Sequence, residues 1–230
     1  MVFEYIVVGN EAIPDPFSNM VGVAVTNLRL VLKKFAQRSI KVNTAVSIFV
    51  LGATFPPSIG VFKLEMKEPM ADLLNRIRTF VLEPVVMVKF PYDYHAQGII
   101  PQDFATFSMD KAYISDGQNG YSNVLDALLG AFYSAMAEEN VTDVKLVVSA
   151  SGWPSTGNGG YTTPTLAAKY NKNFMRRIAS VQGTPARPGQ PVDGFVYNLF
   201  NENQKAVGPA QHFGLFYSDT TPAYNFTVPH

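Results

Sequence analysis

The sequence predicts an α/β protein built on a parallel sheet, and two patterns carry this prediction. Short runs rich in β-branched residues alternate along the chain with longer segments whose apolar residues recur at helical spacing. Five such runs interleave with four helical segments, which is typical of consecutive strand–helix units. A chain of 230 residues with 47% hydrophobic content can bury a sizeable core, so we expect one domain over residues 1–230.

The predicted elements follow in order. Five apolar runs are the predicted strands: Glu4–Val8, Lys41–Ile48, Val85–Phe90, Asp143–Val148 and Gly194–Phe200. The first helix presents one apolar face made of Met20, Val21, Ala24, Val25, Leu28, Val31, Leu32 and Phe35. Two further helices are predicted over 66–81 and 124–136, and a fourth begins at Thr163-Pro164, since proline is favoured at the first helical position. Periodicity alone does not separate an open sheet from a closed barrel.

Composition excludes several classes of function. Eighteen basic residues balance 18 acidic ones, which argues against nucleic acid or an anionic membrane as a partner. The sequence contains no run of 18 apolar residues that could span a membrane, and its first residues lack the features of a signal peptide. There are no cysteines, and His95, His212 and His230 are scattered, so we expect no metal and no organic cofactor. The glycines of Gly157–Gly160 match no nucleotide-binding pattern.

Candidate chemistry gathers where predicted strands end. The first strand ends abruptly in Gly9-Asn10-Glu11, which exposes a carboxyl group at the edge where βα proteins place reactive groups. Tyr92 follows a proline just beyond the third strand, with Phe90 on the other side of that proline, so aromatic rings stand on a stiff piece of backbone there. The segments that matter are Tyr5–Glu11, Phe90–Tyr92, Asp116–Tyr121, Val147–Ser155, Phe200–Lys205 and His212–Tyr217.

In this order, those segments closely resemble the plant endo-1,3-β-glucanases, the family-17 glycoside hydrolases. The resemblance implies a TIM-barrel-derived fold of which about five βα units are present, corresponding to strands four to eight of an eight-stranded barrel. It implies that Glu11 is the general acid and that Asn10 binds a sugar hydroxyl beside it. Tyr92, Glu202 and Lys205 are the implied substrate contacts, the last two as a charge pair that orients sugar hydroxyls.

Trp153, the single tryptophan, is open to two interpretations: it lines the cleft and contacts substrate, or it fixes the strand end in the core. The family places its nucleophilic glutamate at the position of Ala150, three residues earlier. A retaining glycosidase needs two carboxyl groups about 5–5.5 Å apart, so a methyl group there predicts an inactive or nearly inactive protein. Ser149 and Ser151 flank the position and point to the opposite face of the strand. We expect Glu11 and Ala150 to lie on the same rim of the sheet.

Three functions follow from these residues. The first is a non-catalytic relative that recognises β-1,3-glucan or laminari-oligosaccharides. The second is an active endo-1,3-β-glucanase in which Ala150 is an engineered change or a misreading. The third is a structural or defence protein without sugar binding. The resemblance further implies secretion to the cell wall or vacuole, and the unpaired edges of an incomplete barrel predict self-association.

Overall fold

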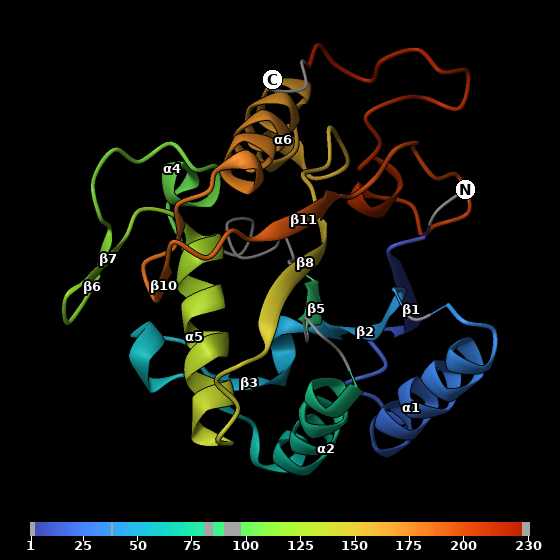
Figure 1. The fold of residues 1–230 in the computed structure, drawn as a ribbon. Coiled ribbons are helices and arrows are strands. Elements are labelled where there is room, and N and C mark those ends of the chain that lie inside the picture. Colours follow the sequence, from blue (N-terminus) through green and yellow to red (C-terminus); the bar gives the residue numbers. More distant parts are fainter. Residues whose placement is uncertain (1–2, 38, 81–84, 90–97, 227–230) are drawn as a thin grey trace. The chain divides into compact units, whose positions relative to one another are not determined.

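The structure is a computed structural model that describes residues 3–37, 39–80, 85–89 and 98–226. The chain forms two compact units, one of residues 1–89 and 128–149 and the other of residues 90–127 and 150–230. Figure 1 shows how strands and helices alternate along the chain. The α/β class predicted from the sequence is therefore confirmed, whereas the extent of a single domain over 1–230 stays a prediction.

The first unit contains neighbouring strands in the order β1-β2-β5-β8. Strand β2 runs parallel to both β1 and β5. The β1–β2 register pairs Tyr5 with Lys41 and Asn10 with Ala45, with an irregularity between Val7 and Asn10. All but the first residue of β2 are buried, as expected for a strand inside a parallel sheet. The strands of the unit are β1 (Tyr5–Asn10), β2 (Lys41–Ser47), β5 (Val85–Lys89) and β8 (Lys145–Ser151), the last two residues of which belong to the second unit.

Helices α1 (Ser18–Lys34) and α2 (Leu64–Phe80) pack side by side in the first unit. A methyl group added at Gly22 of α1 would overlap the carboxylate of Asp72 of α2, so the absence of a side chain there permits the close approach. Only a narrow stripe of α1 around Val21 and Val25 is buried, whereas Met20 and Phe35 are 67% and 71% exposed. Ala24, Leu28 and Leu32 of the predicted face are half-buried, so the predicted apolar face is broader than the part of it that is fully buried.

A compact connection joins β2 to α2 in the same unit. Strands β3 and β4 pair antiparallel within it, and the backbone N–H of Lys63 donates to the carbonyl of Val50 at 2.9 Å. At Gly60, an added methyl group would overlap the carbonyl of Ala131 in helix α5, so the connection lies directly against that helix. Its elements are η1 (Ile48–Val50), β3 (Leu51–Ala53), η2 (Pro57–Ile59) and β4 (Val61–Phe62), and α5 covers Val124–Glu138.

In the second unit, an aromatic core surrounds helix α6 (Pro164–Ala179). The Tyr170 ring lies 5.2 Å from Trp153 and 5.4 Å from Phe107, and it stacks on Phe174. The side chain of Thr163 accepts a hydrogen bond from the N–H of Leu166 and caps the helix, as the Thr163-Pro164 pair predicts. The other elements are α4 (Gln102–Ala105), β6 (Ile114–Asp116), β7 (Asn119–Tyr121), η3 (Gly159–Tyr161), β9 (Gly183–Thr184), β10 (Arg187–Pro188), β11 (Asp193–Val196) and η4 (Pro209–Gln211).

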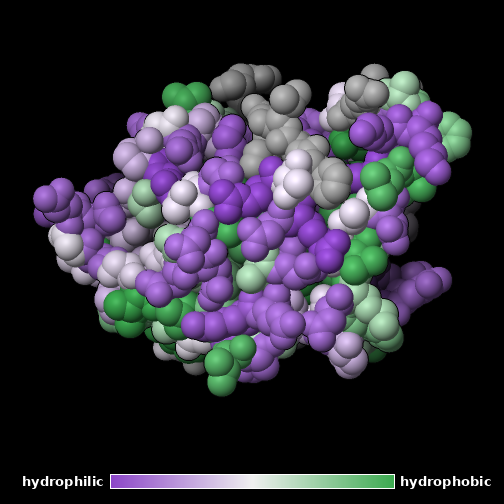
Figure 2. Space-filling model, turned by 60° about the horizontal axis from the view of Figure 1, so that its bottom comes forward, coloured by the Kyte–Doolittle hydropathy of each residue, from purple (hydrophilic) through white to green (hydrophobic). Residues whose placement is uncertain are grey.

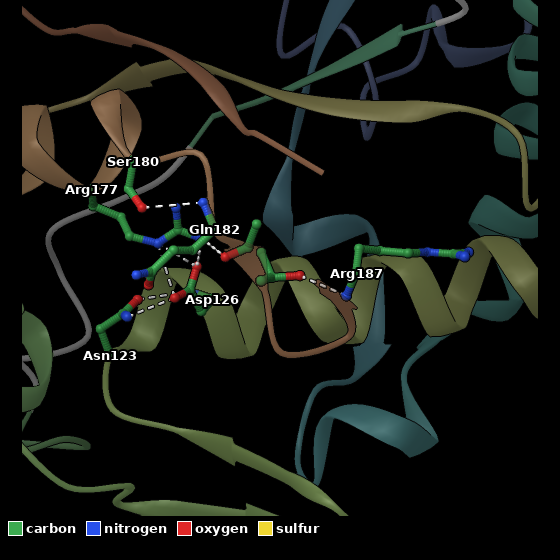
Figure 3. A network of polar contacts seen from close by, with 8 residues as sticks. Asn123, Asp126, Arg177, Ser180, Gln182 and Arg187 are labelled. Carbon is green, nitrogen blue, oxygen red and sulfur yellow. Dashed lines mark hydrogen bonds and ion pairs between the residues drawn. The ribbon is translucent and has the colours of Figure 1, made fainter. Parts of the chain in front are cut away.

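A buried ion pair joins the start of α5 to α6 in this unit (Figure 3). Arg177 Nη2 lies 2.7 Å from Asp126 Oδ1 and donates to the carbonyl of Gly183 at 2.6 Å. Asn123 completes the arrangement, because its amide donates to Asp126 Oδ2 at 2.8 Å. The Arg177 and Asp126 side chains are only 12% and 9% exposed, so each charge depends on the other for stabilisation.

All five predicted strands and four predicted helices are present with shifted ends. The fourth strand extends to Ser151, and the fifth ends at Val196 rather than Phe200. Beyond Val196, Phe200 forms only an isolated bridge with Phe216.

Hydrophilic residues predominate on the face in Figure 2, with separate hydrophobic groups between them. In the part of the chain that the structure describes, no helix is long and apolar enough to cross a membrane.

Candidate active site

In the first unit, Asn10 and Glu11 lie at the carboxyl end of β1. The Glu11 backbone N–H donates to the carbonyl of Ala45 on β2 at 2.7 Å, and the Ser47 N–H donates to the carbonyl of Ile13 at 3.1 Å. The backbone φ of Glu11 is 57°, in the left-handed region that non-glycine residues seldom adopt. Strained backbone of this kind persists where the surroundings fix it, often at functional positions. Glu11 is half-buried and Asn10 is exposed.

In the second unit, position 150 is the second-to-last residue of β8 and is half-buried. The flanking Ser151 hydroxyl is buried and lies 2.6 Å from the hydroxyl of Tyr170, on the side of the aromatic core. Burial raises the pKa of Tyr170, so its hydroxyl stays neutral. Ser149 Oγ is buried without a hydrogen-bond partner among the described residues. Neither flanking serine supplies the negative charge that a glutamate at position 150 would carry.

Trp153 belongs to the core of the second unit. Its side chain is 1% exposed, and its indole N–H donates to the carbonyl of Tyr161 at 2.9 Å. An indole this deeply buried has almost no surface for a sugar ring. Of the two sequence interpretations, the structure supports core packing: Trp153 fixes the end of β8, and its expected role as a substrate contact is not supported by its position.

Glu202 and Lys205 form a cluster with Tyr197 in the second unit. The Tyr197 hydroxyl donates to Glu202 Oε2 at 2.6 Å, and Lys205 Nζ lies 3.8 Å from Glu202 Oε1. The Lys205 ammonium also lies 5.9 Å from the centre of the Tyr197 ring. Burial first, and then the Glu202 carboxylate, raise the pKa of Tyr197. The Tyr197 hydroxyl, and to a smaller degree Glu202, raise the pKa of Lys205, so the amine is charged at neutral pH.

Backbone contacts bring this cluster to the end of β8. The N–H of Tyr197 donates to the carbonyl of Ser151 at 2.8 Å, and the N–H of Ser155 donates to the carbonyl of His212 at 2.9 Å. Glu202 is held in turn, because its N–H donates to the carbonyl of Gln211 at 3.0 Å. The predicted residues Glu202 and Lys205 therefore belong to the same part of the second unit as the strand that ends with position 150.

Tyr197 is the residue of this cluster that sequence reasoning missed. Tyr197 lies inside the predicted last strand, and the pattern there predicts only that its ring is one of the strand's apolar side chains. The early end of β11 frees it to contact Glu202. The sequence does offer one indication of this contact: Tyr197 carries a hydroxyl and stands five residues before Glu202, near the end of the predicted strand.

The remaining candidate residues do not belong to the cluster of Tyr197, Glu202 and Lys205. Tyr92 and His95 lie outside the described residues. Asp116–Tyr121 forms the antiparallel β6–β7 hairpin, and Tyr121 is buried rather than available to substrate. Asn10 and Glu11 belong to the first unit and Ala150 to the second, so the expected proximity of Glu11 to position 150 stays a prediction. Within the described ranges, no group of three or more His, Cys, Asp or Glu is arranged to hold a metal ion.

Comparisons with known proteins identify the family. The probable glucan endo-1,3-β-glucosidase BG5 of Arabidopsis thaliana is 41% identical over 224 residues, which are 96% of this chain and 63% of that protein. Among solved structures, the β-1,3-glucanase and allergen CJP38 of Cryptomeria japonica pollen matches with a TM-score of 0.90 at 32% identity, over 98% of this chain and 72% of that one. A plant β-glucan endohydrolase matches with a TM-score of 0.88 at 33% identity, over 97% and 72% of the two chains.

The chain thus spans less than two thirds of the length of BG5. The model of the glycosyl hydrolases family 17 matches residues 1–228, nearly the whole sequence. The matched range includes the strand-end segments that carry Glu11, Ala150 and Glu202. The chain belongs to glycosyl hydrolase family 17.

Proposed function

We propose that this chain recognises β-1,3-glucan and has little or no hydrolytic activity. The observation that carries the proposal is the contrast between two neighbouring parts of the second unit. The polar cluster of Tyr197, Glu202 and Lys205 is assembled, whereas position 150 carries a methyl group. The relative BG5 is described as a probable glucan endo-1,3-β-glucosidase, and the similar structure CJP38 as a β-1,3-glucanase.

The cluster is suited to binding sugar hydroxyls. Glu202 keeps acceptor capacity beside its bond from Tyr197, and Lys205 carries donors on a half-exposed side chain. Hydrogen bonds in which one partner is charged are about twice as strong as neutral ones. The packing of Tyr197 against Phe213, with ring centroids 5.4 Å apart, holds the phenol in place for Glu202. Recognition therefore needs little rearrangement of these side chains.

Hydrolysis is a different matter. A retaining mechanism needs a carboxylate that forms a covalent bond with the sugar, and Ala150 offers no such group. An inverting mechanism needs a base about 6.5–9.5 Å from the acid. Glu202 is the candidate for that base, but its Oε2 already accepts a hydrogen bond from the Tyr197 hydroxyl at 2.6 Å and its Oε1 lies 3.8 Å from the Lys205 ammonium, so both oxygens are already engaged.

The experiment is a titration of laminari-oligosaccharides against the chain and three variants, with heat of binding as the readout. Glu202→Gln and Lys205→Met should each weaken binding by about tenfold, since each removes a charged partner of a sugar hydroxyl. Lys169→Met is the matched control, because Lys169 forms a comparable surface ion pair with Asp103 at 3.0 Å elsewhere in the same unit. Equal affinities for all four proteins would contradict the assignment of this cluster.

We propose further that the protein acts in the cell wall or vacuole and that it self-associates. The proposal of self-association rests on strand β1, which is at the edge of the sheet in the first unit and pairs with β2 along one side. Sedimentation over a range of concentrations tests self-association, and a constant monomer mass would contradict it. Fractionation of source tissue tests the location, and recovery in the cytosol alone would contradict it.

A further inference from the structure

We propose that Asn140 carries an N-linked glycan. The segment Asn140-Val141-Thr142 is an Asn-x-Thr triplet, the pattern at which an oligosaccharide is attached to an asparagine side chain in secreted proteins. The inference rests on the proposed location in the cell wall or vacuole, because a chain meets this modification when it enters the secretory pathway. It assigns a role to a surface turn of the first unit that lies outside the candidate active site.

The backbone of Asn140 is held at the end of helix α5 by two hydrogen bonds. Its own N–H donates to the carbonyl of Ala137 at 2.9 Å, and the N–H of Val141 donates to the carbonyl of Met136 at 2.9 Å. These two bonds, together with a φ of 59° at Asn140, form the Schellman arrangement that ends many helices. Val141 is fully buried and anchors the turn. The triplet therefore has one fixed backbone conformation.

The two residues of the triplet that the modification requires are both exposed, on either side of the buried Val141. The polar contacts of the turn involve the carbonyl of Asn140, to which Arg78 Nη1 donates at 3.3 Å, and the carboxylate of Asp143, which lies 3.2 Å from Arg78 Nη2. Among the residues that the structure describes, no hydrogen bond engages the side-chain amide of Asn140 or the hydroxyl of Thr142. The helix end accounts for an asparagine with positive φ, but it does not account for the exposed threonine two residues later.

The modification is a group transfer in which one bond forms and one breaks. Nδ2 of Asn140 bonds to C1 of the first sugar of an oligosaccharide that is carried on a polyprenyl diphosphate. The bond between that C1 and the diphosphate oxygen breaks, the diphosphate leaves with the bonding electrons, and the amide nitrogen gives up one proton. The step needs no oxidant or reductant, and its donor and its transferase belong to the secretory pathway.

A glycan on this turn leaves the end of β8 at position 150 accessible. Asn140 lies five residues before Lys145, the first residue of β8, whereas Ala150 is near the carboxyl end of the same strand. The rise from Lys145 to Ala150 is about 16 Å at roughly 3.3 Å per residue. The modification is therefore compatible with glucan recognition at the strand ends.

The experiment translates the chain with microsomes behind a cleavable secretion signal, and the readout is a gel shift that an endoglycosidase removes. Every sample carries Asn225→Gln, because Asn225-Phe226-Thr227 is a second triplet of the same kind. This parent should show the shift of one glycan. Thr142→Ala should abolish the shift and Thr142→Ser should keep it. Asn140→Gly should also abolish it without lowering Tm, because glycine is the favoured residue at this position of a helix end.

Absence of a shift in the parent, or an equal shift in the parent and Thr142→Ala, would overturn the inference. Protein from the source tissue supplies a second measurement, in which peptide mass spectrometry should find the glycan on Asn140. Recovery from the cell wall or vacuole with Asn140 unmodified would overturn the inference and leave the proposed location intact. Recovery in the cytosol alone would overturn both.

Discussion

Replacement of Gly152 by alanine tests how closely the strand end at position 150 is coupled to the Tyr197 cluster. A methyl group at Gly152 would overlap the carbonyl oxygen of Tyr197 and lie 2.9 Å from its carbonyl carbon. Both obstacles are backbone atoms, so no flexible side chain can move away. The segment after β11 must shift by more than a bond length from the end of β8.

The magnitude follows from the bonds that this shift breaks. The hydrogen bond from Tyr197 N–H to Ser151 at 2.8 Å is lost, and that from Asn198 N–H to Phe213 at 3.1 Å is weakened. Each contributes about 0.5–1.5 kcal/mol, and overpacking adds about 1–3 kcal/mol. We expect the free energy of unfolding to fall by about 2–6 kcal/mol, which lowers Tm by roughly 5–20 °C for a chain of this size.

Thermal unfolding followed by circular dichroism measures the effect, and glucan titration at low temperature measures its consequence for the cluster. Gly160→Ala is the control, because a methyl group there meets no heavy atom within 4 Å. That variant should unfold within about 2 °C of the unmodified chain. If Gly152→Ala also unfolds within about 2 °C and binds glucan normally, the described coupling of Gly152 to Tyr197 is wrong.

Three further predictions concern stability and repair. Asp126→Ala leaves the Arg177 guanidinium buried without its carboxylate, so urea unfolding should show a loss of about 3–5 kcal/mol, and a loss below about 1 kcal/mol would count against the pair. Burial raises the pKa of Tyr224 to about 12 from its ordinary value of 10, so the contribution of Tyr224 to stability is full below pH 10 and is lost as the pH rises through 12. Tyr224→Phe should reduce this loss of stability at alkaline pH. An identical dependence of stability on pH in the variant and the unmodified chain would refute it. Ala150→Glu should bind laminari-oligosaccharides yet cut laminarin no faster than Ala150→Gln, because cutting by a retaining mechanism depends on a carboxyl spacing of about 5–5.5 Å and on substrate positioning as well as on the restored group. Rapid cutting by the glutamate variant alone would contradict this.

The fold was largely predictable because each element carries its own local signal. The buried run of β2 and the proline that opens α6 both lie where the sequence pattern places them. The broad apolar face of α1 was misleading, because periodicity reports which residues share a face and not how much of that face finds a partner. Met20 and Phe35 show the difference, since both lie on the predicted face and remain exposed.

The candidate site was predictable only where a motif carried it. Glu202 and Lys205 were identified from their segment, but their partner Tyr197 comes from contacts made beyond the end of β11. The burial of Trp153 likewise depends on Tyr170 and Tyr161, which lie 17 and 8 residues further along the chain and carry no local signal of the contact. Such tertiary contacts decide whether an aromatic residue packs in the core or meets a ligand.

The most direct test of the central claim is one titration. Laminarihexaose is added to the chain, whose Ala150 is first verified by intact mass, and the sugar is recovered and weighed by mass spectrometry after saturation. We predict saturable binding and recovery of the hexaose at full length. Absence of binding, or recovery of shorter oligosaccharides, would contradict the account of a glucan-recognising family-17 protein that does not cut its ligand.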